Sequence, residues 1–256
     1  MTSILFWPDP HTKPGMDNIT RFIAVGNLSC EQQVDHEVLL GDHFDFPSLS
    51  RFDEGMAAME GRVHMEDIEA GQTALDAFQS AIDANNKNRK RKYEPNKEFM
   101  EGNHEWRQEV WLSKYPKFRE TFGLHSLGLA ERGWNVTRYR QKLDLCGFVI
   151  RHHFTNRMGK PLTSENNIGN IIYQKYSVSG IQGHNHLLQV AWNTDAKGKK
   201  YFSGSLGWFG ALGQVEDYAK DSQDFWWNGV VLMKNVEDGY GDPEFFTQER
   251  LLKEYT

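Results

Sequence analysis

The chain has 256 residues, of which 25% are charged and 39% hydrophobic, values typical of a folded globular protein with a substantial core. Acidic residues outnumber basic ones by 35 to 29, which excludes a broad basic surface for non-specific nucleic-acid binding but not a local patch. Two cysteines, Cys30 and Cys146, are too few for a disulfide framework and indicate a reducing compartment.

The N-terminal residues are apolar from Met1 to Trp7, lack a basic leader, and are followed at once by Pro8. We therefore expect no signal peptide, no membrane-spanning segment, no membrane partner and a cytoplasmic location. Residues 3–7 predict a strand, and residues 9–11 a turn.

The next segments alternate loop and regular structure. Residues 12–18 are rich in Pro and Gly and predict a loop, whereas residues 21–26 fit either a strand or the end of a helix. Residues 37–40 predict a buried strand that runs into Gly41 and Asp42. Because ligands in open α/β sheets bind beyond the carboxyl ends of the strands, we expect Asp42 to lie at the centre of a site.

Residues 55–92 carry a helical pattern, in which Gly61 and Gly71 predict breaks. The apolar residues at spacings of three and four are Met56, Met59, Val63, Met65, Ile68, Leu75, Phe78 and Ile82. We expect a single domain over residues 1–256 with a helical insertion at about 50–95, either a cap over the site or the crossover that a parallel strand pair requires. Its basic end, Lys87 to Lys92, is a solvated helix terminus or a contact to a polyanionic substrate near the site.

The second half of the chain predicts alternating helices and strands. Residues 97–100 form a short segment, and a helix is expected to start near residues 101–105 and continue to about residue 122. The remaining expected elements are strands at 143–150, 178–182, 187–192, 200–205 and 226–233, a helix at 165–176, and a short helix from 248.

Five apolar runs are each followed by Asp, Asn or His. These stretches are Asp9-Pro10-His11, Gly41-Asp42 with Asp45, Gly102-Asn103-His104-Glu105, His152 or His153, and Gly183-His184-Asn185-His186. Each is weak alone, since a surface Asp-x-His is common and Gly-Asn-His-Glu can be a plain helix start. All five together, in this order and at strand ends, indicate one shared site.

The types of side chain in these stretches indicate metal binding. Carboxylate, amide oxygen and imidazole suit manganese, iron(II) or zinc without any thiolate. Seven such donors are too many for one ion but suffice for two ions that share a carboxylate. Two ions about 3.5–4 Å apart clamp the attacking and leaving oxygens of an in-line displacement at phosphorus, and a bound water has its pKa lowered toward about 7. We therefore expect two divalent metal ions, with manganese as the first choice and iron or zinc as alternatives.

The ordered set of motifs resembles the calcineurin-like metallophosphoesterase superfamily. The similarity covers Asp-x-His, Gly-Asp-x-x-Asp, Gly-Asn-His-Glu, a later His and Gly-His-x-His, over roughly residues 4–188. Compact members of this kind also resemble phosphoesterases encoded by bacteriophages. The resemblance implies an α/β fold, a four-layer αββα sandwich of two mixed β-sheets flanked by helices, with a dinuclear metal centre at the sheet edges.

The resemblance also implies a role for each residue. The expected ligands are Asp9, His11 and His186 for the first metal, Asn103, His152 and His184 for the second, and Asp42 as the bridge. His104 would protonate the leaving oxygen or stabilise its charge, and Asp45 would accept a hydrogen bond from His104 and fix its tautomer.

The sequence departs from the family pattern in two places. Phe46 follows Asp45 where the protein phosphatases often carry Arg, which argues against a phosphoprotein phosphatase. The fourth motif is usually His-Gly, but here it is His152-His153-Phe154. We favour His152 as the ligand because it comes first after the strand, and leave His153 as the alternative.

Four further residues are expected to lie outside the set of metal ligands. His43 is expected to face away from Asp42, in a supporting or exposed position, and Arg107 is interpreted as a helix-surface ion pair rather than a phosphate contact. Trp208 and Phe209 fit core packing better than a pocket for an aromatic group.

The favoured function is a dinuclear metal-dependent phosphoesterase that hydrolyses a phosphodiester, with nucleic acids and nucleotides as candidates, by in-line attack of a metal-bridging hydroxide. One alternative is a phosphomonoesterase acting on a small phosphorylated metabolite or a phosphoprotein. Another is an inactive module that keeps its metals and binds phosphate or a partner. His104 and Asp45 argue against the inactive module, since neither is needed merely to hold metal. The oligomeric state is not predicted.

Overall fold

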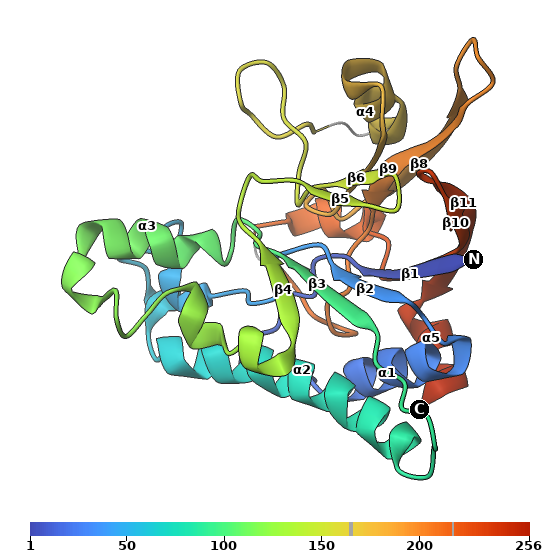
Figure 1. Cartoon of the computed structure of the whole chain (residues 1–256). Coiled ribbons are helices and arrows are strands. Elements are labelled where there is room, and N and C mark those ends of the chain that lie inside the picture. The colour runs from blue at the N-terminus through green and yellow to red at the C-terminus, as the bar shows by residue number, and fades with distance from the viewer. Residues whose placement is uncertain (164–165, 217) are drawn as a thin grey trace.

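Two mixed β-sheets lie face to face with helices on their outer sides, the four-layer α/β arrangement predicted from the sequence (Figure 1). They are seen in a computed structural model that describes residues 1–163, 166–216 and 218–256. Among these residues, no helix combines the length and the apolar character needed to cross a bilayer.

The larger sheet has six strands, of which the four neighbours β1 to β4 are parallel. Strand β10 pairs antiparallel with β1, and β11 extends the sheet beyond it. In spatial order the strands are β11 (Tyr240–Thr247), β10 (Gly229–Glu237), β1 (Thr2–Trp7), β2 (His36–Leu39), β3 (Asn96–Met100) and β4 (Trp134–Thr137).

The smaller sheet has five strands: β5 (Leu143–Leu145), β6 (Phe148–Ile150), β7 (Ser179–Gln182), β9 (Lys200–Leu206) and β8 (Leu188–Thr194), in spatial order. Strands β6, β7 and β9 are parallel, and β5 and β8 form antiparallel edges. The single strand predicted at 143–150 is wrong, because Cys146 and Gly147 adopt φ values of 50° and 85° and turn the chain into a hairpin.

Helices cover both outer faces. Those on the six-stranded sheet are α1 (Thr20–Gln32), α2 (His64–Asn86) and α5 (Gln248–Tyr255); α4 (Ile168–Tyr176) covers the five-stranded sheet, and α3 (Trp106–Lys114) follows β3. Residues 21–26, which fitted two assignments, are helical. Helix α3 ends before the predicted residue 122 because Pro116 disfavours helical backbone at the residue before it. Residues 164 and 165, at the start of the helix expected over 165–176, lie outside the described residues.

Alternating side chains of β1 explain why the layers pack. Ile4 and Phe6 face the second sheet and join the core between the sheets, whereas Leu5 and Trp7 face α1 and α2. All four are fully buried. The strand is therefore hydrophobic on both faces, as strands in the middle of a layered α/β fold are.

Helix α2 connects the parallel neighbours β2 and β3, so it is the crossover that such a pair requires. The predicted break at Gly71 is wrong, since α2 runs through it. A Cβ there would lie 2.1 Å from the ring of Phe44, so glycine allows the helix to approach that ring.

The basic run Lys87 to Lys92 follows the far end of α2. The first residue of α2, His64, packs on Phe46 beside the site, at 5.2 Å between ring centroids. With 23 residues at 1.5 Å each, α2 is about 34 Å long. The interpretation of this run as a substrate contact near the site is therefore wrong.

Candidate metal centre

Five loops meet at one end of the two sheets and carry all nine residues predicted for the site. Strands β1, β2 and β3 are parallel neighbours in the larger sheet, and β6 and β7 are parallel neighbours in the smaller one. The loops after these strands bring Asp9, His11, Asp42, Asp45, Asn103, His104, His152, His184 and His186 together. The site thus lies where the carboxyl ends of both sheets converge.

The first group of donors contains Asp9, His11 and His186, the three residues predicted for one metal. One ligand atom from each lies within 4.8 Å of the others, and all three side chains are buried. His186 Nε2 lies 3.2 Å from Asp9 Oδ2.

The second group contains His152, His184 and Asn103. His152 Nε2 lies 2.9 Å from Asn103 Oδ1, and ligand atoms of His152, His153 and His184 lie within 4.8 Å of one another. His153 thus lies beside the predicted ligands.

Asp42 lies between the two groups. Its Oδ2 is 3.3 Å from His152 Nε2 in the second group and 3.9 Å from His11 Nε2 in the first. Its Oδ1 accepts a hydrogen bond from the backbone N–H of His104, at 2.8 Å. A carboxylate between the two groups is placed to bridge two ions, one held by each group.

Hydrogen bonds at Nδ1 orient two of the imidazoles. His152 Nδ1 lies 2.8 Å from the carbonyl oxygen of Leu40, and His11 Nδ1 lies 3.0 Å from Asp45 Oδ1. Each partner is an acceptor, so each Nδ1 carries a proton and each Nε2 lies on the side of Asp42. His152, rather than its neighbour His153, is oriented in this way toward Asp42.

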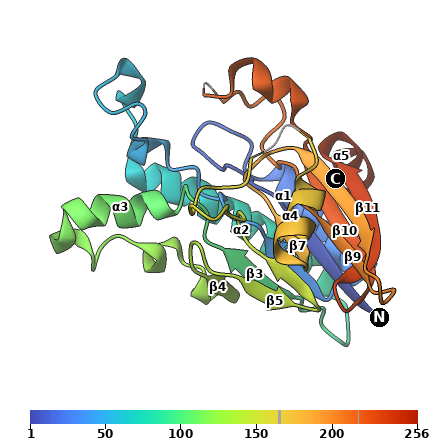
Figure 2. The same ribbon diagram turned by 90° about the horizontal axis from the view of Figure 1, so that it is seen from above.

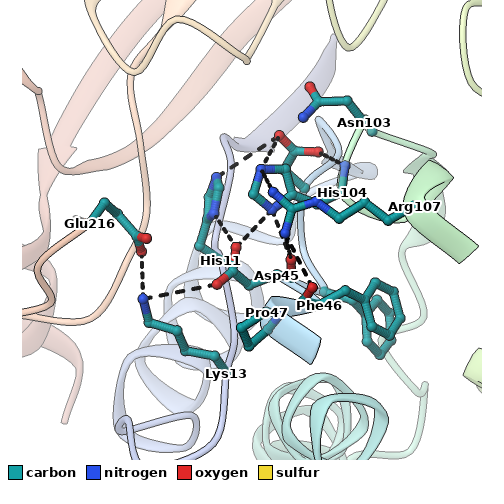
Figure 3. Close-up of polar contacts among 12 residues, drawn as sticks. His11, Lys13, Asp45, Phe46, Pro47, Asn103, His104, Arg107 and Glu216 are labelled. Atoms are coloured by element: carbon teal, nitrogen blue, oxygen red, sulfur yellow. Dashed lines mark hydrogen bonds and ion pairs between the residues drawn. The ribbon is translucent and has the colours of Figure 1, made fainter. Parts of the chain in front are cut away.

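His104 and Asp45 form a pair at the side of these donors (Figure 3). His104 Nδ1 lies 2.7 Å from Asp45 Oδ1, the contact predicted from the motifs, and 2.9 Å from the carbonyl oxygen of Asp45. The other ring nitrogen, Nε2, is 3.9 Å from Asp42 Oδ2. Asp45 Oδ1 therefore accepts from both His104 and His11 and fixes both rings.

The loops have strained backbones. Five of the seven predicted ligands have positive φ: Asp9 (41°), His11 (45°), Asp42 (50°), His184 (67°) and His186 (59°). Such conformations cost about 1–3 kcal/mol each in non-glycine residues and persist where the surrounding structure imposes them. Two glycines make room for the carboxylates, since a Cβ at Gly102 or Gly183 would lie 2.2 Å from an oxygen of Asp42 or Asp9.

The pKa values of the site residues are shifted in different directions by their surroundings. Burial raises the pKa of Asp9 to about 7, whereas His152 and His104 outweigh burial and hold the pKa of Asp42 well below its usual range. In return, Asp42 overcomes the effect of burial on His152 and raises its pKa to about 10. Burial and neighbouring imidazoles lower the pKa of His184 and His186 well below the usual value. These two rings are neutral, the form in which imidazole binds metal.

Glu105 supports the site, a role the sequence analysis did not assign. Its buried carboxylate accepts hydrogen bonds from the backbone N–H groups of Asp42, Phe44 and Gly102, at 3.0, 2.8 and 2.9 Å. It thereby fixes the two loops that follow β2 and β3. The signal was present, because Glu105 is the fourth residue of the Gly-Asn-His-Glu motif.

Arg107 is a site residue rather than the helix-surface ion pair expected. Its Nη1 donates to the carbonyl oxygens of Asp45 and Phe46 at 2.8 and 3.2 Å, and its Nη2 lies 3.0 Å from His104 Nε2 (Figure 3). Lys13, also missed, pairs with Glu216 at 2.8 Å. These two residues are 203 positions apart, so no local spacing could have indicated the pair.

His43, Trp208 and Phe209 lie around the site. His43 is fully buried, and its Nε2 lies 3.0 Å from the carbonyl oxygen of Gly71; burial lowers its pKa to about 3. The neutral ring therefore supports the loop after β2. Phe209 and Trp208 are both buried, as expected, and the ring of Trp208 packs beside that of His186 at 6.2 Å between centroids.

A cavity of about 780 Å³ opens over the donors. Its floor includes His11, Asp42, Asn103, His104 and His186, and its walls include Lys13, Arg62, Arg107, Phe52, Tyr218 and Trp226. This volume lies within the range of small-molecule sites, about 300–1,000 Å³.

Comparisons with known proteins give no family and no function. No family model matches the chain, and no curated protein matches it. One solved crystal structure aligns over 96% of this chain and 99% of its own at 11% identity and a TM-score of 0.43. A likeness at this level supports no argument about the site.

Proposed function

We propose that this chain is a dinuclear metal-dependent phosphoesterase, as its resemblance to the calcineurin-like superfamily implies. The observation that carries the proposal is the convergence of donors from five distant stretches around Asp42, with His104 and Asp45 beside them. We further propose a phosphodiester as the substrate class. The cytoplasmic location remains a prediction from the sequence.

The donors fit divalent cations. Asp9 Oδ1 and His11 Nε2 are buried and have no hydrogen-bond partner among the residues that the structure describes. A buried polar atom left in this state costs about 1–3 kcal/mol, and a coordinated cation removes the cost. The first ion would be held by Asp9, His11 and His186, the second by Asn103, His152 and His184, and both by Asp42. Manganese, iron(II) and zinc all suit this donor set.

The chemistry divides between the ions and the protein. When bound, the two ions would lower the pKa of a coordinated water toward about 7 and supply a nucleophile near neutral pH. His104 Nε2 accepts a hydrogen bond from Arg107 here, and once protonated it would give that proton to the leaving oxygen. Asp45 would stabilise the protonated ring by accepting its Nδ1–H, since an orienting carboxylate stabilises an imidazolium. Arg107, beside Nε2, would contact the phosphoryl oxygens.

Hydrolysis of two chromogenic esters tests the proposal. The purified protein, loaded with manganese, is expected to hydrolyse bis(p-nitrophenyl) phosphate several-fold faster than p-nitrophenyl phosphate, and EDTA is expected to abolish both rates. A faster monoester rate would contradict the diester preference and favour the phosphomonoesterase. If metal-loaded protein turned over neither ester, the inactive binding module would replace the enzyme.

A further inference from the structure

Two aromatic side chains on the walls of the site cavity are exposed to solvent. Phe52 is 83% exposed and Tyr218 is 56% exposed, and both line the cavity. Seen from above, residues 50–62 and 218–226 project as two separate segments on the same side of the molecule as the loop of residues 12–18 (Figure 2). Exposed aromatic side chains at the walls of a cavity indicate a binding surface.

One wall is a continuous row of rings. It begins at His186, one of the proposed ligands, whose ring lies 4.1 Å from that of Trp226 at an interplanar angle of 77°. The ring centroid of Trp226 in turn lies 6.1 Å from that of Tyr218. The backbone fixes this wall to the site, because the N–H of Trp227 donates to the carbonyl oxygen of His186 at 3.1 Å. A flat group attached to a phosphate at the floor would therefore lie along this wall.

The charges of the cavity match one phosphate group rather than a polymer. The cations that line it are Lys13, Arg62 and Arg107, but Lys13 pairs with Glu216 at 2.8 Å and Arg62 with Asp53 at 2.6 Å. The basic run Lys87 to Lys92 lies at the far end of α2. A nucleic-acid strand needs a basic groove that follows its backbone, and the described residues of this cavity do not supply one.

We infer that the substrate is a nucleotide-sized phosphoester whose base stacks on the aromatic walls at Phe52 or Tyr218 while its phosphate lies at the metal centre. The inference rests on the proposed function for the placement of the phosphate. Stacking of a base on an aromatic side chain is sequence-tolerant, since every base has a π-face. The inference therefore assigns the class of substrate but no particular base.

Two probes with the same scissile bond test the inference. Thymidine 5′-(p-nitrophenyl phosphate) and methyl p-nitrophenyl phosphate both release p-nitrophenolate and differ in the group that would stack. We expect kcat/KM to be about tenfold or more higher for the thymidine probe, the size of effect that stacking one base gives. In Phe52→Leu or Tyr218→Leu this ratio should fall severalfold. Trp192→Leu, a matched change of an aromatic side chain that is 52% exposed on β8 outside the cavity, should keep it. Equal rates for the two probes, or a ratio that survives both cavity substitutions, would overturn the inference.

Calorimetric titration separates this inference from the proposed function. Thymidine 5′-phosphate is expected to bind the manganese-loaded protein at least tenfold more tightly than methyl phosphate, and Tyr218→Leu to weaken the nucleotide more than methyl phosphate. If neither chromogenic probe were hydrolysed, the phosphoesterase proposal would fail and the titration would still decide whether a base stacks in the cavity. Phosphotyrosine serves as the second aromatic ligand, and tighter binding of phosphotyrosine than of the nucleotide would overturn the assignment to nucleotides.

Discussion

Glu37 and Asp42 are buried carboxylates five residues apart, on β2 and the loop after it, and their surroundings differ completely. Glu37 faces the helices, where its oxygens accept hydrogen bonds from Trp7 Nε1, at 2.8 Å, and from the hydroxyl of Ser29. Asp42 faces imidazoles that belong to two donor groups, at 3.3 and 3.9 Å. Burial of a carboxylate is therefore not by itself a sign of function. The sign at Asp42 is that several potential metal ligands surround the carboxylate, whereas Glu37 is surrounded by hydrogen-bond donors.

The pKa values of the two carboxylates are also shifted in opposite directions. Burial raises the pKa of Glu37 to about 8, because hydrogen bonds from neutral groups do not compensate for the lost hydration of the charge. At Asp42, nearby imidazoles outweigh burial and hold the pKa well below its usual range. Glu37 is part of the packing of β2 against α1, whereas Asp42 is stabilised in its negatively charged form.

The largest expected effect comes from replacing Asp42 with an amide, and the same change at Glu37 is the control. Asp42→Asn should lower kcat/KM by more than about 100-fold and reduce bound metal below two ions per chain, since even groups behind the ligands contribute about 10–100-fold. Glu37→Gln is the matched control, because an amide can accept from Trp7 and donate to Ser29. Its rate should stay within about threefold of the original. Ester hydrolysis and elemental analysis measure the two quantities, and an equal loss in both variants would remove the distinction.

His104→Ala should lower kcat by about 10²–10⁴-fold and leave two ions bound, because His104 is expected to act on the leaving oxygen rather than on metal. The loss should shrink for esters of more acidic alcohols, which depart without a proton. Metal analysis alongside hydrolysis checks the assignment, and a variant that lost metal would show that His104 is a ligand.

The pH dependence of stability should show the effect of Glu37. Its pKa is raised from 4.5 to about 8 in the folded chain, so the folded state binds the extra proton between these values. The contribution to the free energy of unfolding is complete below pH 4.5 and is lost as the pH rises toward 8. Between pH 5 and 8 the free energy of unfolding should therefore fall by about 1–3 kcal/mol less in Glu37→Gln than in the original chain. Urea unfolding of protein treated with EDTA measures this difference. Parallel curves for the two proteins would contradict the neutral state of Glu37.

The smallest effect is expected at the other end of α2. Replacing Lys90, Arg91 and Lys92 with Ala should change kcat/KM by less than about twofold and the free energy of unfolding by less than about 0.5 kcal/mol per residue, as for surface positions generally. A large loss of rate on a dinucleotide substrate would mean that the substrate reaches far beyond the cavity.

The sequence predicted the site better than it predicted the boundaries of the elements. The nine site residues follow apolar runs that end in turns, and the carboxyl ends of parallel strands meet at one edge of a sheet. Turns that depend on one residue were less visible, as at Cys146, where left-handed backbone converts one predicted strand into two. Gly71 was misinterpreted for the opposite reason, because its value lies in a contact with Phe44 that no local pattern reveals.

Residues that act across long separations were also missed. Lys13 and Glu216 meet because the loop after β1 and the segment after β9 face the same cavity, and neither residue stands in a recognisable motif. Trp226 was predicted as the start of a strand, but β10 begins at Gly229 and leaves Trp226 free to pack on His186. Tertiary contacts, rather than propensity, decide such positions.

Each proposed ion draws its donors from both sheets, and this has a consequence for the newly made chain. Asp9 leaves the ribosome 177 residues before His186, a delay of roughly ten to thirty seconds at the usual rate of translation. Until the second sheet has formed, the first ion would lack His186 and the second would lack His152 and His184. Metal uptake would thus be a late event in biogenesis, and once completed it would lock the two sheets together.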